Sequence, residues 1–406
     1  MSHSQITLDD ALLQRLFQND GLKPLLESLL NQVLQTQASD QLAALPYERT
    51  EERQGYRNGY RQRGFTTRIG TLTLQVPRLR PGSFTPDLYE RWQRSEQALL
   101  ACLVERVVAG VSTRTVSAVV EELCGTAVSQ SSVSALCQRL DPQVSAWRER
   151  SLLEQTYPFV LVDALVIRVR CDGRVRQRSL LLATGVNREG YRTLLGLHLG
   201  DKESAASWGA FFAHLKQWGL SGVDLVVSDS HGGLVNAIHT HFQGAVWQRC
   251  QTHRSRNILS ACPQAAQDAL HKHLRRLFEA ETPAVARQEL AAILERFAKS
   301  APKSCDGLEA AFDDAIAVLG LPERYRKRLP TTNSLERLNE EIRRRERVNR
   351  IFANAASAER LLGALWMECD EAFSTGHRYF EMSEYWQWKQ QQPQQPPSES
   401  VPPLAA

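Results

Sequence analysis

The sequence predicts an α/β protein in which a sheet-forming region lies between helical regions. Residues 157–250 alternate apolar strand patterns with helices, whereas residues 252–328 show helical spacing of alanine and leucine and no strand pattern. Residues 98–140 carry two further helical patterns ahead of the sheet-forming region. Three strands joined by short turns, followed by a helix and short buried strands, form an α/β layer rather than a β-sandwich.

The bulk composition is that of an ordinary globular protein. The chain has 406 residues, which suits about two to four domains, and a net charge of +4. It contains no run of about 18 apolar residues, and the start MSHSQITLDDALLQRLF lacks the basic and apolar regions of a signal peptide. The eight cysteines are scattered rather than densely spaced. We therefore expect a cytoplasmic protein in a reduced setting, with no membrane partner.

Two helices and a short β element come first. Apolar residues recur at helical spacing over 7–44, and Gly21 and Pro24 separate two groups of them: Leu12, Leu13, Leu16 and Phe17, then Leu25, Leu26, Leu29, Leu30 and Leu34. These two expected helices suit a small bundle, a dimer surface or part of a DNA-binding head. A strand-like alternation around Gly70 then predicts a small twisted β element, formed by Ile69, Leu72, Leu74 and Val76.

Arginine is concentrated in two blocks. Between Arg49 and Arg94 there are ten arginines, no lysines and four acids, with aromatic residues interleaved in RNGYRQRGF. Between Glu323 and Arg350 there are ten basic residues and five acids. Each block alone fits a solvated basic face as well as it fits a phosphate-binding surface. Because candidate functional acids lie in the chain along with these two basic blocks, we expect a nucleic acid as partner.

Residues 98–140 have the pattern of a helix-turn-helix. One helix is expected to start after Ser112 in GVSTRTVSAVVEELCG, and a second in SQSSVSALCQRL, with Ser129 or Ser131 as its N-cap. The polar first turn of the second helix, followed by apolar residues, is typical of a recognition helix. A plain helical hairpin is the alternative.

The region 157–250 supplies the sheet. The expected strands are YPFVLVDALVIRVR, SLLLATGVN, YRTLLGLHLG, VDLVVSD and GAVWQRC, and the expected helix between the third and fourth is SAASWGAFFAHLKQWG.

Two acids in this region are candidate functional residues. Asp163 interrupts the apolar run FVLVDALVI. Burying an ionised carboxylate there costs on the order of several kcal/mol of folding free energy, unless a cation, a basic partner or exposure at a cleft compensates the charge. A strand end or a bulge is the structural alternative. Asp229 follows the apolar strand DLVVS, at the edge of a sheet where ligand sites form. Asp229 also suits a simple N-cap of the next helix.

Glu336 is the third candidate. It lies in LPTTNSLERLNEEIRRRERVNRIF, where Leu335, Leu338 and Ile342 form the buried stripe and Glu336 shares a different face with Glu340 and Arg343. The alternative is a capping box, with an N-cap at Asn333 and Glu336 three residues later. Three carboxylates that converge from a strand, a strand end and a helix would hold two Mg²⁺ ions for a phosphodiester displacement.

Cys250 and His253 form a lone C-x-x-H in WQRCQTHRSRNIL. Half a zinc site is a weak signal, and no second pair has convincing ligand spacing. A packed structural corner beside the acidic residues is the preferred interpretation. Arg249, Arg254 and Arg256 around it are candidates for contact with DNA.

Several segments together resemble a known family, the Mutator-type transposases of bacterial insertion sequences (the insertion sequence 256 family). They occur in the family's order, cover about residues 45–375, and are specific as an ordered set: YERTEERQGYRNGYRQR, GTLTLQVPRLRPGSF, GVSTRTVSAVVEELCG, VDALVIRVR, VVSDSHGGL, WQRCQTHRSRNIL and TTNSLERLNEEIRRRERVNRIF. The resemblance implies an RNase H-like catalytic core with an all-helical insertion between the second and third acids.

The resemblance also implies how the residues work. The family's acidic triad falls on Asp163, Asp229 and Glu336, as catalytic residues and as ligands of two Mg²⁺ ions, for which Mn²⁺ can substitute. Its C-x-x-H falls on Cys250 and His253. The expected substrates are the terminal inverted repeats of the element and a target DNA, without ATP. A homodimer or larger assembly is expected because two DNA ends must be brought together.

The residues and the resemblance together predict seven regions. These are an N-terminal helical segment for oligomerisation (1–45), a basic β element that binds DNA (46–95), a helix-turn-helix-like region that binds DNA (96–150), the first part of the catalytic core (151–251), the helical insertion (252–328), the C-terminal helices of the core (329–385) and a disordered tail (386–406). The expected DNA-binding residues are Arg57, Asn58, Arg61, Arg63, Arg78, Arg80, Arg256, Asn333, Arg337, Arg343, Arg344 and Arg345.

Three positions depart from the family pattern. Pro330 stands where the family usually has arginine, Ala353 where it has proline, and Ser230-His231 where it tends to have Gly-Ala. Two alternatives to an active transposase therefore stay open. One is an inactive or domesticated DNA-binding descendant, and the other is an RNase H-like DNA nuclease that cuts without joining.

Overall fold

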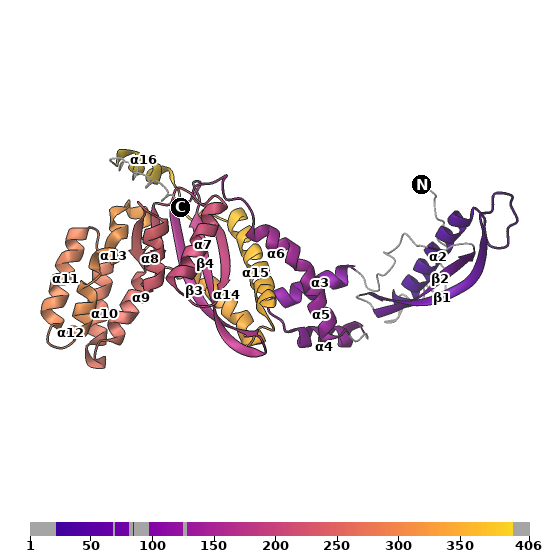
Figure 1. The fold of residues 1–406 in the computed structure, drawn as a ribbon, viewed down its shortest axis with the longest axis horizontal. Coiled ribbons are helices and arrows are strands. Elements are labelled where there is room, and N and C mark those ends of the chain that lie inside the picture. The colour runs from indigo at the N-terminus through magenta and orange to yellow at the C-terminus, as the bar shows by residue number, and fades with distance from the viewer. Residues whose placement is uncertain (1–21, 68–69, 81–83, 85–96, 125–127, 393–406) are drawn as a thin grey trace, which may run out of the picture. The chain divides into compact units, whose positions relative to one another are not determined.

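The computed structural model describes residues 22–67, 70–80, 84, 97–124 and 128–392. The chain divides into two compact units, Met1–Arg139 and Leu140–Ala406, and each is considered by itself. Figure 1 shows the order of the elements. The expected helix around Leu12 and Phe17 and the strand residue Ile69 lie outside the described residues. Within the described ranges, no helix is long and apolar enough to cross a membrane.

The first unit begins with helix α2 (Leu22–Leu42) packed on an antiparallel hairpin of β1 (Tyr56–Thr67) and β2 (Gly70–Arg80). Every second residue of β2 is buried against α2, since successive strand residues point to opposite faces; Leu34 meets Leu72, Leu74 and Val76 in this core. Side chains of α2 also accept hydrogen bonds from β2, at 2.7 Å from Thr73 N to Glu27 and at 2.7 Å from Gln75 N to Asn31. The expected β element is confirmed.

Three helices follow in the same unit: α3 (Gln97–Val108), α4 (Thr113–Cys124) and α5 (Gln130–Cys137). Their shared core contains Leu103, Val116, Val120 and Val133. The N-cap of α5 is Ser129, whose side chain accepts a hydrogen bond from Ser132 N. The two helices expected here are therefore present, at the expected starting points.

The short helix η1 (Gln138–Leu140) spans the division between the units. The second unit continues with α6 (Asp141–Arg148) and contains a five-stranded sheet of order β5-β4-β3-β6-β7. Strands β3 (Phe159–Cys171), β4 (Arg174–Val186) and β5 (Arg192–Gly200) pair antiparallel, and β6 (Leu225–Ser228) and β7 (Val246–Arg249) run parallel to β3. Asp172 and Gly173, both with positive φ, turn the chain from β3 to β4. All five expected strands are confirmed, and the protein is α/β.

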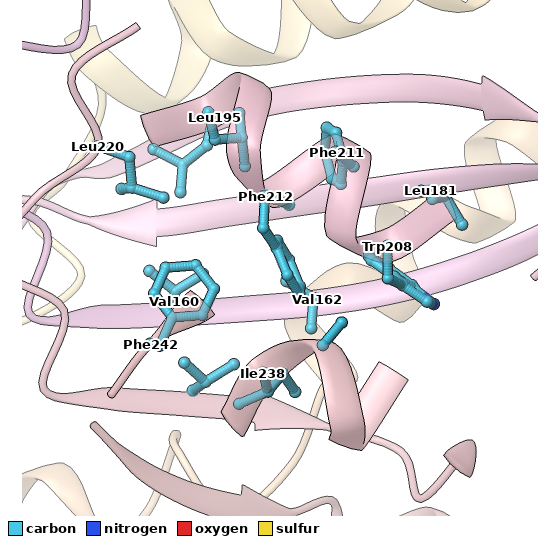
Figure 2. Packing of buried hydrophobic residues seen from close by; sticks show 14 of the residues in the cluster. Val160, Val162, Leu181, Leu195, Trp208, Phe211, Phe212, Leu220, Ile238 and Phe242 are labelled. Atoms are coloured by element: carbon cyan, nitrogen blue, oxygen red, sulfur yellow. The ribbon is translucent and has the colours of Figure 1, made fainter. Parts of the chain in front are cut away.

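Helices α7 (Ala205–Gln217) and α8 (Gly232–His241) cover one face of this sheet. Figure 2 shows the core between these two helices and the sheet, where Val160 and Val162 of β3 meet the rings of Trp208, Phe212 and Phe242. Because side chains alternate along a strand, Leu161, Asp163 and Leu165 point to the opposite face. On β3 that face meets α14 (Asn333–Asn349) and α15 (Ala355–Thr375).

Between β7 and α14 the chain forms helices only, as expected for 252–328. They are α9 (Gln251–Ser260), α10 (Gln264–Phe278), α11 (Pro283–Phe297), α12 (Pro302–Glu309), α13 (Phe312–Ile316), η2 (Ala317–Gly320) and η3 (Glu323–Tyr325). They have a core of their own, which includes Leu274, Leu277, Ile293 and Phe297. Figure 1 shows these helices in orange beside the sheet.

The last described helix, α16 (Ser383–Gln391), extends past residue 386, where the tail was expected to begin. The chain is ordered further than expected because aromatic residues anchor this helix. The Tyr385 ring packs against Phe159 and Tyr325, and the Tyr385 hydroxyl donates to Asp224 at 2.6 Å. The remainder of the expected tail, 393–406, lies outside the described residues.

Candidate active site

Asp163 of β3 lies next to Asp229, which follows the carboxyl end of the neighbouring strand β6. Strands β3 and β6 are parallel, and Phe159, Val160 and Leu161 pair with Leu225, Val226 and Val227. Continuing this register by two residues brings Asp163 opposite Asp229, just beyond the end of β6. Neighbouring strands are about 4.8 Å apart, so the two carboxylates face one space.

Asp163 is held in the middle of β3, in unbroken register with Leu182 of β4. The interpretation of Asp163 as a residue at a strand end or a bulge is therefore wrong. Its Oδ1 accepts from Ala164 N at 2.9 Å, and its Oδ2 accepts from Asn339 Nδ2 at 2.6 Å. Burial raises the pKa of the Asp163 carboxyl to about 6, although both hydrogen bonds and nearby His253 lower it. The charge of Asp229 adds to the rise.

Asp229 follows β6 but does not cap the next helix. The N-cap of α8 is His231, which makes no side-chain capping bond. One oxygen of Asp229 accepts from His231 N at 3.1 Å, which closes a local turn before the helix. The carboxylate is only partly buried, so it can receive a ligand from solvent.

Glu336 lies in the first turn of α14. The N-cap of this helix is Thr332, without a side-chain capping bond, and Asn333 is already helical. The capping-box interpretation of Glu336 is therefore wrong, and its carboxylate is not engaged in closing the helix start. Glu336 is one turn before Asn339, the residue that bonds Asp163, and residues three apart lie on one helix face. Its side chain is partly exposed.

Asp163 and Asp229 lie close together, and no closed metal site forms around them among the described residues. Among the described residues, no group of three or more His, Cys, Asp or Glu side chains is close enough to hold an ion together. The paired carboxylates of Asp163 and Asp229 nevertheless fit a hard divalent cation, which prefers oxygen ligands and keeps several waters. The raised pKa of Asp163 supports this fit, because a largely buried carboxylate gains from a nearby cation.

Cys250 and His253 join the end of β6 to the start of α14. Cys250 N donates to Ser228 O at 2.7 Å, and both the N and Oγ1 of Thr332 lie 3.4 Å from the Cys250 sulfur. The next residue, Gln251, donates its N–H to Pro330 O at 2.9 Å. These hydrogen bonds bring the start of α14 to the end of β6, which Asp229 follows. The Cys250 side chain is fully buried.

Electrostatics at this corner tie His253 to the acids. A hydrogen bond with Cys250 raises the pKa of the His253 imidazole despite burial, and the charges of Asp163 and Asp229 raise it further. Burial raises the pKa of the Cys250 thiol, but hydrogen bonds with His253 and Thr332 outweigh burial and lower it. Among the described residues no third ligand joins Cys250 and His253, and the corner is packed and hydrogen-bonded.

The basic residues expected to bind DNA are mostly exposed in the first unit. Asn58, Arg61, Arg78 and Arg80 are exposed, and Arg63 is half-buried. Arg57 differs, since its guanidinium donates to Ala44 O at 3.3 Å and to Ser39 Oγ at 2.7 Å. These bonds hold β1 to the end of α2, which leaves Arg57 less able to contact a phosphate.

The expected DNA-binding residues of the second unit differ in their exposure. Arg256 and Arg337 are exposed, and Asn333 is exposed with its Oδ1 accepting from Thr252 Oγ1 at 3.1 Å. The other three, Arg343, Arg344 and Arg345, lie on α14. Arg343 and Arg344 pair with Glu346 and Glu341, whereas Arg345 is only 4% exposed and also pairs with Glu341.

Arg254 is one of the arginines suggested for DNA contact, and the structure places it elsewhere. Its side chain is 1% exposed and donates to the carbonyl groups of Gly307 and Leu308 within the helical insertion. It therefore holds α9 to α12 and has no surface for a ligand.

Asn339 and Thr332 were not singled out in the sequence, yet both shape the site. Asn339 bonds Asp163, and Thr332 bonds Cys250. Asn339 carries a signal that was available, since it lies three residues after Glu336 and a polar amide at that spacing shares its helix face. The role of Thr332 depends on a contact with a residue 82 positions away, which no local pattern reveals.

Comparison with known proteins identifies the class and then the family. The sequence model of the family described as "Transposase, Mutator family" matches residues 2–376 of this chain. The chain is 42% identical over 364 residues to the transposase of insertion sequence element IS256 in transposon Tn4001 from Staphylococcus aureus, which covers 89% of this chain and 93% of that protein. It is 42% identical over 365 residues to the transposase of ISRM5 from Rhizobium meliloti, covering 90% and 92%.

A third relative has the same class. The transposase of insertion sequence element IS1081 from Mycobacterium tuberculosis is 38% identical over 361 residues, which cover 89% of this chain and 87% of that protein. These matches define the protein as a transposase. The chain belongs to the Mutator family of transposases, of the IS256 type.

Proposed function

We propose that this transposase binds the terminal inverted repeats of an insertion sequence and cuts and rejoins DNA through a DDE triad of Asp163, Asp229 and Glu336. The observation that carries the proposal is the register of β3 and β6, which brings Asp163 opposite Asp229, with the Glu336 helix bonded to Asp163 through Asn339. The relatives are named as transposases of insertion sequence elements, which supports the choice of substrate.

The core that carries the triad is of the RNase H-like type in this proposal. Support comes from the five-stranded sheet, in which three antiparallel strands are followed by two parallel ones. Further support comes from the helical region of α9 to η3, which separates Asp229 from Glu336 in the chain. In this arrangement the insertion ends at the start of α14 and leaves the third acid beside the first two.

Each residue has a defined role. Asp163 and Asp229 hold Mg²⁺, with Glu336 as the third ligand, and Asn339 keeps the Asp163 carboxylate turned toward α14. When bound, a pair of Mg²⁺ ions, or Mn²⁺ in their place, stabilises the attacking and leaving oxygens of an in-line displacement. Arginines on the same unit contact the DNA backbone and position it without taking part in the chemistry.

Two displacements at this site account for transposition. In the first, water attacks a phosphodiester at the end of the element, a P–O bond forms as another breaks, and a 3′-hydroxyl leaves. In the second, that hydroxyl attacks a phosphodiester of the target DNA, a new P–O bond joins the element to the target, and the target's own P–O bond breaks to release a 3′-hydroxyl. The number of phosphodiester P–O bonds is conserved in the second displacement, so joining needs no ATP. The protein works at the nucleoid, as a dimer or larger assembly that brings two ends together.

DNA recognition falls to the first unit, through its β1–β2 hairpin and its α4–α5 pair. The exposed arginines of β1 and β2 offer phosphate contacts, and α5, with its polar first turn, is the candidate recognition helix. Replacement of Arg61 or Arg80 by alanine would then weaken binding on all sequences and flatten its salt dependence.

The test uses purified protein, labelled DNA that carries the element's own ends, and Mg²⁺. Asp163→Asn, Asp229→Asn and Glu336→Gln are each expected to lower cleavage at least about a hundredfold while DNA binding is retained. Glu340→Gln is the matched control, since Glu340 is an exposed acid on the same helix and is outside the proposed triad. A variant that retains cleavage removes its residue from the triad.

The products separate the remaining alternatives. Joined products from the wild-type protein support the transposase, whereas cleavage that is never followed by joining identifies a nuclease. Binding without cleavage under Mg²⁺ or Mn²⁺ identifies an inactive descendant, and the first position to restore to the family pattern is then Pro330. Pro330 is buried and bonded to Gln251 through its carbonyl group.

A further inference from the structure

A strongly basic cavity lies at the far end of α14 from Glu336. Its volume is about 380 Å³, and its walls come from Val166, Arg168 and Gln177 of the β3–β4 hairpin and from four residues of the end of α14: Arg343, Glu346, Arg347 and Arg350. Four arginines and one glutamate therefore surround one cavity. We propose that this cavity binds a backbone phosphate of the DNA strand that leaves the candidate active site. The proposal rests on the proposed function of that site.

The charge balance of the cavity favours an anion. Glu346 is the only acid among the residues that line the cavity, and it forms an ion pair with Arg343. The Arg343 guanidinium also donates to Val166 O at 2.9 Å. Within the part of the chain that the structure describes, Arg168, Arg347 and Arg350 have no carboxylate partner, and all three are exposed. Three guanidinium groups that converge without a counter-charge suit a phosphate, which accepts several charge-assisted hydrogen bonds.

The backbone holds these arginines close together. Beyond Leu161, β3 has no partner in β6, and the chain after α14 takes this edge: Phe352 N donates to Arg168 O, and Arg170 N donates to Phe352 O, both at 2.9 Å. The buried Phe352 ring anchors the connection. Arg350 stands two residues before Phe352, which pairs with β3 next to Arg168, so the backbone holds Arg350 close to this strand. Arg168 lies opposite Gln177 of β4 across the hairpin.

Arg350 has a backbone conformation that other residues adopt more easily. Its φ is 55° and its ψ is −48°, in the region that favours glycine. An arginine at such a position is retained at a cost in stability, and strain of this kind occurs at functional sites. The alternative is that Arg347 and Arg350 serve only to offset the negative end of the α14 dipole.

The position of the cavity identifies which DNA it would hold. The helix rises about 1.5 Å per residue, so the turn that carries Arg347 lies about 12 Å along α14 from Asn339, which bonds Asp163. That distance corresponds to about two to four nucleotides of one strand. A phosphate a few nucleotides from the one being cut would therefore reach Arg347 and Arg350 while the cut phosphate lies at the acids.

The experiment measures equilibrium binding by fluorescence anisotropy, in EDTA, on a labelled duplex with the element's own end. Arg350→Gly and Arg347→Ala are each expected to weaken binding about tenfold and to lower the slope of log affinity against log salt by about one. Because glycine suits the backbone at position 350, Arg350→Gly is expected to keep or raise the melting temperature. Arg287→Ala, which removes an exposed arginine paired with Asp313 on the helical insertion, is the control and should bind as the wild type does.

A single uncharged phosphate locates the contact. Methylphosphonate is placed at one position at a time, and wild-type binding should weaken at a position two to four nucleotides from the cleavage point. At that position Arg350→Gly should show no further loss. Wild-type affinity and salt slope in both arginine variants would overturn the proposal, as would a lower melting temperature with unchanged binding, which is the outcome for a role in the helix dipole. Since cleavage is not measured, failure of the DDE proposal is a separate result.

Discussion

Replacement of Asp163 by asparagine should stabilise the metal-free protein while abolishing its cleavage activity. Asp163 is a largely buried carboxylate whose pKa is raised to about 6, chiefly by burial, and its neighbours include the like charge of Asp229. Asparagine has nearly the same shape and carries no charge. It can also satisfy its neighbours: the amide of Asn339 has a buried Oδ1 without a hydrogen-bond partner, and a flipped Asn339 would accept from the new side chain.

The magnitude follows from the pKa. A rise from 3.8 to about 6 corresponds to about 3 kcal/mol at a pH well above 6, since one pKa unit is about 1.4 kcal/mol. The side chain retains some exposure, so we expect a gain of about 1–3 kcal/mol in the free energy of unfolding. For a unit of this size the melting temperature should rise by roughly 2–10 °C.

The effect should depend on pH with a definite sign. The folded-state pKa of Asp163 is raised, so the carboxylate destabilises the fold fully above about pH 6, and this cost falls as pH drops from 6 toward 3.8. The difference between Asp163→Asn and the wild type should be largest at pH 8. It should shrink by about half at pH 5, where most of the wild-type side chain is protonated in the folded state.

Thermal unfolding in EDTA, at pH 8 and at pH 5, is the assay, with Glu340→Gln as the control that should unfold as the wild type does. Added Mg²⁺ should then raise the melting temperature of the wild type and not that of Asp163→Asn, because only the wild type keeps the ligand. A variant that is equal to or less stable than the wild type at pH 8 in EDTA would contradict the reasoning. It would mean that the carboxylate is already compensated by its protein neighbours.

Two further outcomes are expected. Tyr385→Phe should lower the free energy of unfolding by about 1–2 kcal/mol, because Asp224 loses a 2.6 Å hydrogen bond, and unchanged chemical denaturation would show that α16 contributes little. A zinc chelator should leave the melting temperature unchanged, because Cys250 bonds both His253 and Thr332 and no third ligand joins the pair among the described residues. Stoichiometric zinc in the purified protein, with unfolding on its removal, would contradict this.

Local patterns in the sequence were sufficient for most of the secondary structure. The strands β3 to β7 and the helices between them follow from runs of apolar residues at the spacing of a strand or a helix, and these runs are long enough to be distinctive. The expected start of the tail at residue 386 was wrong because Tyr385 and Trp386 stand next to a glutamine- and proline-rich sequence. Their packing against Phe159 and Arg188, far away in the sequence, makes α16 an ordered helix.

The sequence by itself determined the family and the α/β class and singled out three candidate acids, because each of these rests on residue types in a fixed order. Only the tertiary structure decided which alternatives hold at each acid. Asp163 lies in mid-strand, Asp229 does not cap α8, and Glu336 is free of the capping box because helix α14 begins one residue earlier than the pattern suggested. The basic cavity was also invisible in the chain. Arg168 and Arg350 meet there because the pairing of β3 with β6 ends at Leu161 and Phe352 pairs with β3 further along. Such pairing depends on contacts between distant segments rather than on local sequence.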